Sequence, residues 1–359
     1  MKSPALPRGF SFAARLYLRP VGLTLISAAP PEALPLAGGP LAFAALQVAI
    51  ADDGDVQRTT ASLADVLSWA SAEGREEEIR QQLNRITSAR APVAGLDFSA
   101  PRVMGILNVT PDSFHDGGQD KNTAAAVARG QALATAGADI VDIGGESTRP
   151  GAQPVPEEDE LNRVLPVVGG LAAKTTLSID SRRAGVLASC LAAGAGLAND
   201  VHALTGEGCL EAVAKSGAPV ILMHGPADPA VMQSDTDYED VSLDTWDWLA
   251  GRIAACEAVG ISRDRILVDP GIGFSKTAEQ SARVLGDIAL YHGLGCVVVL
   301  GASRKSFIAG VSKGEASEDR LPGSIAAVNY ALSQGVQVLR VHDVAETVQA
   351  IAVWQSMVC

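Results

Sequence analysis

Short apolar runs alternate with longer helical stretches from about residue 101 to the end of the chain. The runs are rich in valine, isoleucine and leucine, and they cover residues 102–110, 138–147, 175–181, 196–203, 219–225, 266–273, 297–306 and 336–343. Buried parallel strands covered by helices produce this alternation. Eight such units in about 260 residues predict an α/β fold, a (β/α)8 TIM barrel.

A doubly wound open sheet would give the same alternation, but it needs a phosphate-binding loop after its first strand. The segment NVTPDSF (108–114) is not glycine-rich, and the chain has no dinucleotide-binding or Walker sequence. The closed barrel is therefore preferred. Because all eight strands of a barrel end at the same face, polar residues far apart in the sequence should meet there.

The first hundred residues follow a different pattern. They predict two strands and then two helices, at 15–26, 41–51, 62–70 and 76–89. Residues 91–95 are expected to be a linker. Because no motif with chemical function occurs before residue 101, we expect residues 1–100 to be a small α+β extension of unknown role, docked on the barrel or completing a dimer. Residues 101–359 are expected to form the barrel.

Composition and charge limit the function. Apolar residues make up 47% of the chain and charged residues 19%, which suits a globular protein with a large core. The net charge of −13 argues against nucleic-acid and membrane partners, because their non-specific attraction needs clustered Lys and Arg. An anionic ligand would therefore need a local basic site.

The cysteines and the apolar stretches bear on the compartment. The five cysteines form no Cys-x-x-Cys pair and no zinc spacing, so we expect reduced thiols and a cytoplasmic protein. Residues 34–51 carry proline and glycine within their apolar run, which disfavours a membrane span. The run 21–29 loosely resembles a signal peptide, but a core strand is the preferred interpretation.

Polar residues follow the first two predicted strands. Asn108 opens the loop NVTPDSFHDGG, and Arg149 lies in the loop ESTRPG, where it could hold a carboxylate or phosphate through paired hydrogen bonds. Taken alone, the composition of either loop is that of an ordinary turn.

Carboxylates and an amide follow strands three, four and six: Asp180, Asn199 with Asp200, and Asp269. Facing inward, they would suit a heterocycle with several N–H donors and a carbonyl, and a pterin is such a molecule. Asp180 and Asp269 could instead cap the segments that follow them. That alternative is weaker for three strands at once.

Cations follow the last two strands, where barrels commonly bind phosphate. Arg340 and His342 lie two residues apart, so they should share one side of their strand and could meet a diphosphate. Lys305 lies in the string SRKS of the seventh unit, and its neighbour Arg304 is expected to be a solvated side chain.

Together, the strings NVTPDSFHDGG, DIGGESTRPGA, IDS, ND, DPGIGF, SRKS and RVHDV resemble dihydropteroate synthase from about residue 102 to about residue 351. The resemblance implies condensation of 6-hydroxymethyl-7,8-dihydropterin diphosphate with p-aminobenzoate, assisted by Mg²⁺, in a homodimer. The implied catalytic residues are Asp180, Lys305 and Arg340. The implied pterin site comprises Asp180, Asn199, Met223, Asp269 and Lys305; the diphosphate site comprises Asn108, which also binds the metal, Arg340 and His342; and the p-aminobenzoate site comprises Phe114, Thr148, Arg149, Pro150 and Ser306.

The chain departs from the family in one segment. Ser275 stands where the family often has glycine or alanine, and Gln280-Ser281 stand where a His-Asn pair is common. We expect these departures to affect loop geometry more than chemistry. Two alternative functions remain: a methyltetrahydrofolate-binding methyltransferase or corrinoid-protein subunit, which lacks the STRPG and SRKS loops, and a pterin-binding paralogue without turnover.

Overall fold

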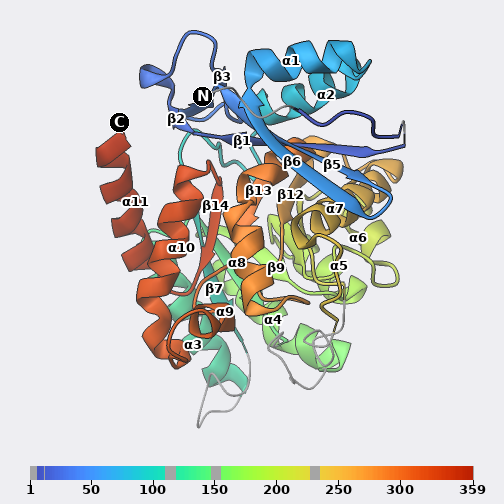
Figure 1. Ribbon diagram of the computed structural model, residues 1–359. Helices are drawn as coiled ribbons and strands as arrows, with labels where there is room; N and C mark the ends of the chain where they lie inside the picture. Colours follow the sequence, from blue (N-terminus) through green and yellow to red (C-terminus); the bar gives the residue numbers. More distant parts are fainter. Residues whose placement is uncertain (1–5, 12, 110–118, 147–154, 227–234, 359) are drawn as a thin grey trace.

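A closed barrel of eight parallel strands forms the larger part of the molecule, in the order β10-β11-β12-β13-β14-β7-β8-β9 (Figure 1). The computed structural model describes residues 6–358 except 12, 110–118, 147–154 and 227–234. The barrel strands are β7 (Arg102–Asn108), β8 (Ile140–Gly144), β9 (Thr176–Asp180), β10 (Leu197–Asp200), β11 (Val220–Met223), β12 (Ile266–Asp269), β13 (Val297–Leu300) and β14 (Val338–Val341). They coincide with the eight apolar runs, so the predicted TIM barrel is confirmed.

Helices cover the outside of the barrel (Figure 1). They are α3 (Gln119–Thr135), α4 (Glu157–Leu171), α5 (Ala184–Ala192), α6 (Cys209–Ser216), α7 (Val241–Ala258), α8 (Ala278–Gly286), α9 (Ser306–Gly310), α10 (Leu321–Ser333) and α11 (Val344–Val358). No helix in the described part of the chain is long and apolar enough to cross a membrane.

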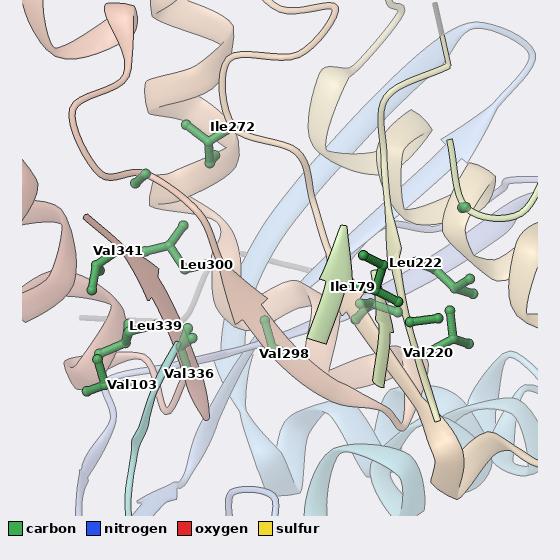
Figure 2. Close-up of a cluster of buried hydrophobic side chains, with 14 of the residues drawn as sticks. Val103, Ile179, Val220, Leu222, Ile272, Val298, Leu300, Val336, Leu339 and Val341 are labelled. Atoms are coloured by element: carbon green, nitrogen blue, oxygen red, sulfur yellow. The ribbon is translucent and has the colours of Figure 1, made fainter. Parts of the chain in front are cut away.

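Strand periodicity divides the apolar side chains into two clusters. In β11, Ile221 packs inside the barrel with Met104 and Leu267. Its neighbours Val220 and Leu222 pack outside with the helices, in the larger cluster shown in part in Figure 2. The inner cluster fills the amino-terminal half of the barrel, so side chains further along each strand on the same face point toward the opposite mouth.

The N-terminal region, residues 6–90, contains two small sheets and two helices. Its elements are β1 (Arg15–Val21), β2 (Thr24–Leu25), β3 (Leu34–Pro35), β4 (Leu41–Phe43), β5 (Ala45–Asp52), β6 (Asp55–Ser62), α1 (Leu63–Ala72) and α2 (Glu76–Thr87). The strand orders are β1-β5-β6 and β2-β4-β3. Both predicted helices are present, but each predicted strand is divided between the two sheets: 15–26 contains β1 and β2, and 41–51 contains β4 and β5.

The sheet β1-β5-β6 packs on the flank of the barrel over α7 and the 3₁₀ segment η4 (Ile288–Leu294) (Figure 1). Tyr17 lies between the two parts: its ring meets Trp246 edge-on with centroids 5.3 Å apart, and its hydroxyl donates to Asp247 at 2.7 Å. The expected docking of the N-terminal region on the barrel is therefore observed.

The predicted linker, residues 91–95, is not a free connection. Val93 and Leu96 form an antiparallel bridge, and together with Phe98 they pack onto the inner cluster. This segment, residues 93–98, closes the amino-terminal mouth of the barrel and is called the plug below. The linker prediction is wrong because the apolar positions 93, 96 and 98 find a partner in the open end of the barrel.

Candidate active site

A buried ion-pair network lies at the carboxyl-terminal mouth of the barrel. Arg340 donates through Nε to Asp142 at 2.7 Å and through Nη2 to Asp180 at 2.6 Å. The same Oδ2 of Asp142 also accepts a hydrogen bond from Asn199 Nδ2 at 3.2 Å. The network joins the ends of β14, β8, β9 and β10.

The site residues share one position in the barrel pattern, two residues after an inner core side chain. The pairs, core residue first, are Ile140 and Asp142, Leu197 and Asn199, Ile221 and Met223, Leu267 and Asp269, and Val338 and Arg340. On β13 the same position, two after Val299, is Gly301. Gly301 therefore has no side chain at the position where the other strands carry site residues.

Three predicted residues surround Gly301. A Cβ atom placed there would lie 3.2 Å from Asp269 Oδ2 and 3.9 Å from both Lys305 Nζ and Arg340 Cδ. Lys305 Nζ donates to the carbonyl of Ile272 and lies 4.3 Å from the centroid of the Phe274 ring. A flat ligand bound beside Gly301 would therefore have the carboxylate of Asp269 and the cations of Lys305 and Arg340 within reach.

Asn108 and Asp180 flank a second glycine. Strand register aligns Asn108 with Gly144 and Gly144 with Asp180. A Cβ atom on Gly144 would lie 3.7 Å from Asp180 Oδ2 and 3.8 Å from Asn108 Oδ1. The side-chain oxygens of Asn108 and Asp180 therefore both lie close to Gly144, and that of Asp180 is bonded to Arg340.

Burial controls the protonation of this cluster. Burial raises the pKa of Asp180 to about 7, against the attraction of Arg340. Burial also raises the pKa of Asp269, while Lys305 opposes the shift. Burial lowers the pKa of Lys305 to about 8, although Asp269 stabilises its charge. The pKa shifts favour the neutral acid at Asp180 and Asp269 and the neutral amine at Lys305. Shifted pKa values of this kind are typical of functional sites.

An apolar wall borders the site on one side. Met223 packs with Val201 and Phe274, and its strand register places it beside Asp269. The chain turns sharply after Asp269, where Gly271 has φ +69° and donates to Asp269 Oδ1 at 2.8 Å. A Cβ atom on Gly271 would lie 1.9 Å from the carbonyl oxygen of His224, so only glycine fits this turn.

His342 lies just beyond β14, with Nδ1 3.1 Å from the hydroxyl of Ser303. Ser306 is the first residue of α9 and is exposed. Arg304 is not the solvated side chain that we expected, because it forms a two-pronged ion pair with Asp343. Four residues predicted for p-aminobenzoate, Phe114, Thr148, Arg149 and Pro150, lie outside the described residues.

Asp200 was expected to face inward with Asn199, and this is wrong. Asp200 accepts hydrogen bonds from the backbone N–H groups of His202 and Leu204 at 2.8 and 2.9 Å. Adjacent residues of a strand face opposite sides, so Asn199 and Asp200 could not both point into the barrel. Asp200 organises the turn after β10 instead.

Asp142 is the central carboxylate that the sequence interpretation missed. It is fully buried, and its Oδ1 has no hydrogen-bond partner among the described residues. The signal was present: Asp142 is the one charged residue within the run IVDIG, on the same face as Ile140. An isolated carboxylate in a buried strand needs a cation, and Arg340 provides it.

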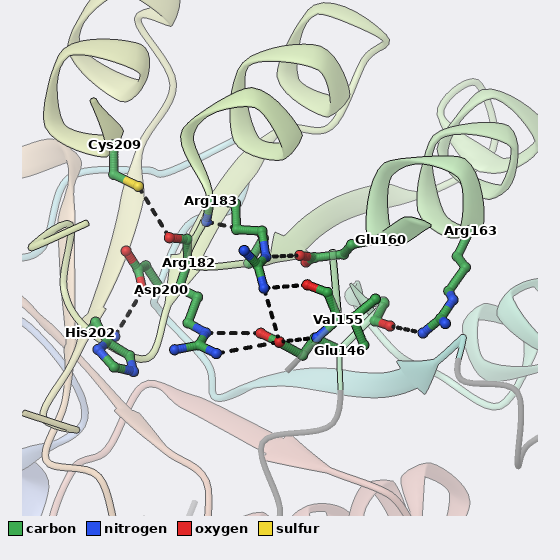
Figure 3. Close-up of polar contacts among 11 residues, drawn as sticks. Glu146, Val155, Glu160, Arg163, Arg182, Arg183, Asp200, His202 and Cys209 are labelled. Atoms are coloured by element: carbon green, nitrogen blue, oxygen red, sulfur yellow. Dashed lines mark hydrogen bonds and ion pairs between the residues drawn. The ribbon is translucent and has the colours of Figure 1, made fainter. Parts of the chain in front are cut away.

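Glu146 and Val155, which flank positions 147–154 in the sequence, belong to a network of carboxylates and arginines (Figure 3). Glu146 accepts from the backbone N–H of Val155 at 2.9 Å and pairs with Arg182 and Arg183. Arg183 also pairs with Glu160 at 3.1 Å. Glu146 and Val155 are thus bonded to each other, and Arg183, the N-cap residue of α5, links Glu146 to Glu160 on α4.

The family departures are accommodated locally. Ser275 has φ +49°, a left-handed conformation that favours glycine. Ser281 accepts from the backbone N–H of Gly273 at 3.1 Å, and Gln280 completes a capping box with Thr277 at the start of α8. As expected, the substitutions affect the loop and the helix start; the site residues above come from other positions.

A buried lysine supports the loop after β12. Lys276 Nζ lies 2.8 Å from His224 Nδ1 and donates to the carbonyls of Gly271 and Phe274 at 3.3 and 3.1 Å. Burial lowers its pKa to about 7 and lowers the pKa of His224 well below its usual range. Neither residue was singled out from the sequence.

Lys276 should make stability depend on pH. In the unfolded chain a lysine keeps its proton up to about pH 10.4, whereas in the folded protein it releases the proton near pH 7. The free energy of unfolding should therefore fall as pH decreases from about 10 to 7, by up to about 1.4 kcal/mol per pH unit. Urea unfolding at several pH values should show a steeper slope in the wild type and in K215M, an exposed control, than in K276M, where Lys305 still contributes above about pH 8. An equal slope in all three proteins would contradict the assignment.

Comparisons with known proteins agree with this geometry. The profile of the pterin binding enzyme family matches residues 104–342. Dihydropteroate synthase of Escherichia coli K12 is 43% identical over 260 residues, which cover 72% of this chain and 92% of that protein. A structure of the Xanthomonas albilineans enzyme with 4-aminobenzoic acid has a TM-score of 0.70 and 47% identity, covering 75% of this chain and 97% of that one. Another, with 7,8-dihydropteroate, has a TM-score of 0.67 and 44% identity, covering 73% and 95%. The chain therefore belongs to the dihydropteroate synthase family of pterin-binding enzymes.

Proposed function

We propose that this chain condenses 6-hydroxymethyl-7,8-dihydropterin diphosphate with p-aminobenzoate to give 7,8-dihydropteroate and diphosphate, in folate biosynthesis. The observation that carries the proposal is the convergence of Asp269, Lys305 and Arg340 around Gly301. A buried carboxylate beside two cations suits a heterocycle that offers N–H donors on one edge and acceptors on another. Relatives bound to 4-aminobenzoic acid and 7,8-dihydropteroate support the substrate and product.

In the proposed mechanism, Asp269 and Asn199 bind the edge of the pterin, Lys305 donates to its acceptor atoms, and Met223 packs against the ring. Asp180 lies where positive charge develops on the pterin methylene as diphosphate departs. A carboxylate near that carbon lowers the barrier electrostatically. Its bond to Arg340 favours the ionised form, although burial raises the pKa of Asp180 to about 7.

The leaving group is proposed to bind to Asn108, Arg340 and His342. Nε and Nη2 of Arg340 are occupied by carboxylates, whereas its Nη1 has no partner among the described residues and remains free for a phosphate oxygen. Phe114, Thr148, Arg149, Pro150 and Ser306 are proposed to bind p-aminobenzoate.

Mg²⁺ is proposed to bind at Asn108. The described residues contain no cluster of three His, Cys, Asp or Glu that could hold a metal ion by itself. The oxygens of Asn108 and Asp180 beside Gly144 nevertheless fit an ion that takes most of its ligands from water and substrate phosphates, as Mg²⁺ does. When bound, Mg²⁺ would neutralise charge on the departing diphosphate.

A homodimer in the cytoplasm completes the proposal. The four described cysteines are free and buried, which suits a reducing compartment. Tyr330 on α10 and Val353 and Met357 on α11 are exposed apolar residues, which supports burial of this face by a second copy. Sedimentation of the wild type and of M357E would test the dimer.

Product formation from the pterin diphosphate and p-aminobenzoate tests the function directly. Dihydropteroate and diphosphate should appear in equal amounts, and neither should form without Mg²⁺. A folded protein that binds the pterin but forms no product would instead be a paralogue without turnover. A protein that transfers a methyl group from methyltetrahydrofolate would belong to the other alternative.

Asp269→Asn should weaken pterin binding. The change keeps the size but replaces one acceptor with an amide donor, which leaves a pterin N–H poorly paired at a cost of about 1 to 3 kcal/mol. Calorimetry with the hydroxymethyl pterin should show roughly a tenfold or greater loss of affinity. D264N, an exposed aspartate at the other end of the barrel, is the control and should bind normally. Unchanged affinity in folded D269N would exclude this contact.

A further inference from the structure

A cavity of about 330 Å³ lies between the N-terminal region and the barrel, at the end opposite the candidate active site. Helix α2 forms one wall, and the first residues of β12 and β13, Ile266 and Val297, form the other. Three arginines, Arg85, Arg90 and Arg263, line it together with the buried Cys296. A space of this size accepts a small metabolite.

Arg85 is a half-buried cation in the lining of this cavity. Its side chain forms no hydrogen bond or ion pair with the described residues. Gly295 lies against it and against Arg263: a Cβ atom there would be 3.1 Å from Arg85 Cγ and 3.5 Å from Arg263 Cδ. Burial lowers the pKa of Arg85, as does the neighbouring Arg263, while Glu257 opposes the shift.

Arg90 also forms no ion pair with a carboxylate among the described residues. It donates to the carbonyls of Arg85, Ser88 and His292 at 2.8, 3.1 and 3.2 Å, and its buried Nε has no partner. Burial lowers its pKa to about 10.

The carboxylates close to the cavity are engaged elsewhere. The two carboxylate oxygens of Glu257 accept hydrogen bonds from Nε and Nη2 of Arg263, both at 2.9 Å. Asp264, which also lines the cavity, accepts from the hydroxyl of Ser262. Among the described residues, Arg85 therefore has no ion-pair partner, and Arg90 donates only to carbonyl oxygens.

This grouping of arginines is energetically unfavourable unless an anion binds beside them. Removing a guanidinium from water without a counter-charge is unfavourable, and two neighbouring cations repel each other. The chain carries 41 acidic residues and a net charge of −13, so an unpaired arginine pair is not explained by a shortage of carboxylates.

We propose that this cavity is a binding site for a small anionic molecule, whose carboxylate or phosphate group is held by Arg85, with Arg90 and Arg263 beside it. The wall formed by Ile266, Cys296 and Val297 would take an apolar part of the same molecule. Because the lining comes from both parts of the chain, the ligand binds only when the N-terminal region is docked. Binding would therefore stabilise the docked form by mass action.

The full chain should be tested by thermal unfolding with increasing inorganic phosphate or benzoate, at constant ionic strength adjusted with sodium chloride. R80Q is the matched control, because Arg80 is an exposed arginine of the same helix that pairs with Glu77. Any effect at the active site is common to both variants. We expect R85Q to need roughly tenfold or more anion for the same shift in midpoint as R80Q, since charge-assisted bonds to arginine are lost. The more effective probe identifies the carboxylate or phosphate class.

A second variant keeps the test decisive if R85Q fails to fold. Ala91 is exposed and lines the cavity, so A91E would place a carboxylate beside the arginines. We expect A91E to have a higher midpoint without anion and a weaker response to added anion. Equal responses of R85Q and R80Q to both probes, or an unchanged response in A91E, would overturn the proposal.

Discussion

Replacement of Arg340 by alanine is expected to abolish turnover and to destabilise the fold. The change leaves Asp142, which is fully buried, and Asp180 without their shared cation. Breaking a buried ion pair from one side costs about 3 to 5 kcal/mol. Because the same guanidinium is proposed to bind the leaving diphosphate, kcat should fall by roughly 100-fold or more. Urea unfolding and product formation measure the two effects separately.

The control for R340A is R102A. Arg102 pairs with Asp97 and Asp139 at the other end of the barrel, on the neighbouring strand β7. These pairs are more exposed, so R102A should cost about 1 kcal/mol or less and leave turnover intact.

A double variant separates the structural from the chemical role of Arg340. In D142N/R340A the buried charge that lost its partner is also removed, so part of the stability should return without any recovery of turnover. If R340A kept turnover within tenfold of the wild type, Arg340 would not bind the leaving group.

The barrel was predictable because one physical pattern repeats eight times. Each strand is a short run of buried aliphatic residues that ends in polar residues or glycine, and helices separate the runs. The N-terminal region lacks this repetition. Its strand β6, with the sequence DVQRTTAS, was missed because it is an edge strand with a largely polar, partly exposed surface.

The candidate site was predictable where a strand-end residue also belongs to a recognisable string. Asp269 and Lys305 were found in this way. Asp142 and Lys276 were not, because their roles depend on neighbours supplied by the fold: Arg340 comes from a strand far along the chain, and His224 comes from the end of β11. Period-two counting within each strand would have found Asp142 and would have excluded Asp200.

The contacts of the N-terminal region predict a large loss of stability when it is removed. A chain of residues 92–359 would expose Leu243 and Leu290 and would lose Tyr17 from the interface. Burial of each such side chain contributes about 1.5 to 3 kcal/mol, and together they predict a loss of about 5 kcal/mol. For a protein of this size the midpoint of thermal unfolding should fall by roughly 10 °C. Since no proposed site residue precedes residue 102, turnover per folded molecule should be unchanged.

A shorter chain, residues 101–359, tests the plug separately. It would also lose Val93, Leu96 and Phe98, which close the amino-terminal mouth over Met104 and Ile221. We expect residues 92–359 to unfold cooperatively and residues 101–359 to expose the inner core and aggregate, as measured by calorimetry and light scattering. Equal stability of the two truncated chains would show that the plug does not support the barrel. A folded chain 92–359 that binds the pterin diphosphate but has no turnover would show that the N-terminal region contributes to catalysis through the flank it covers.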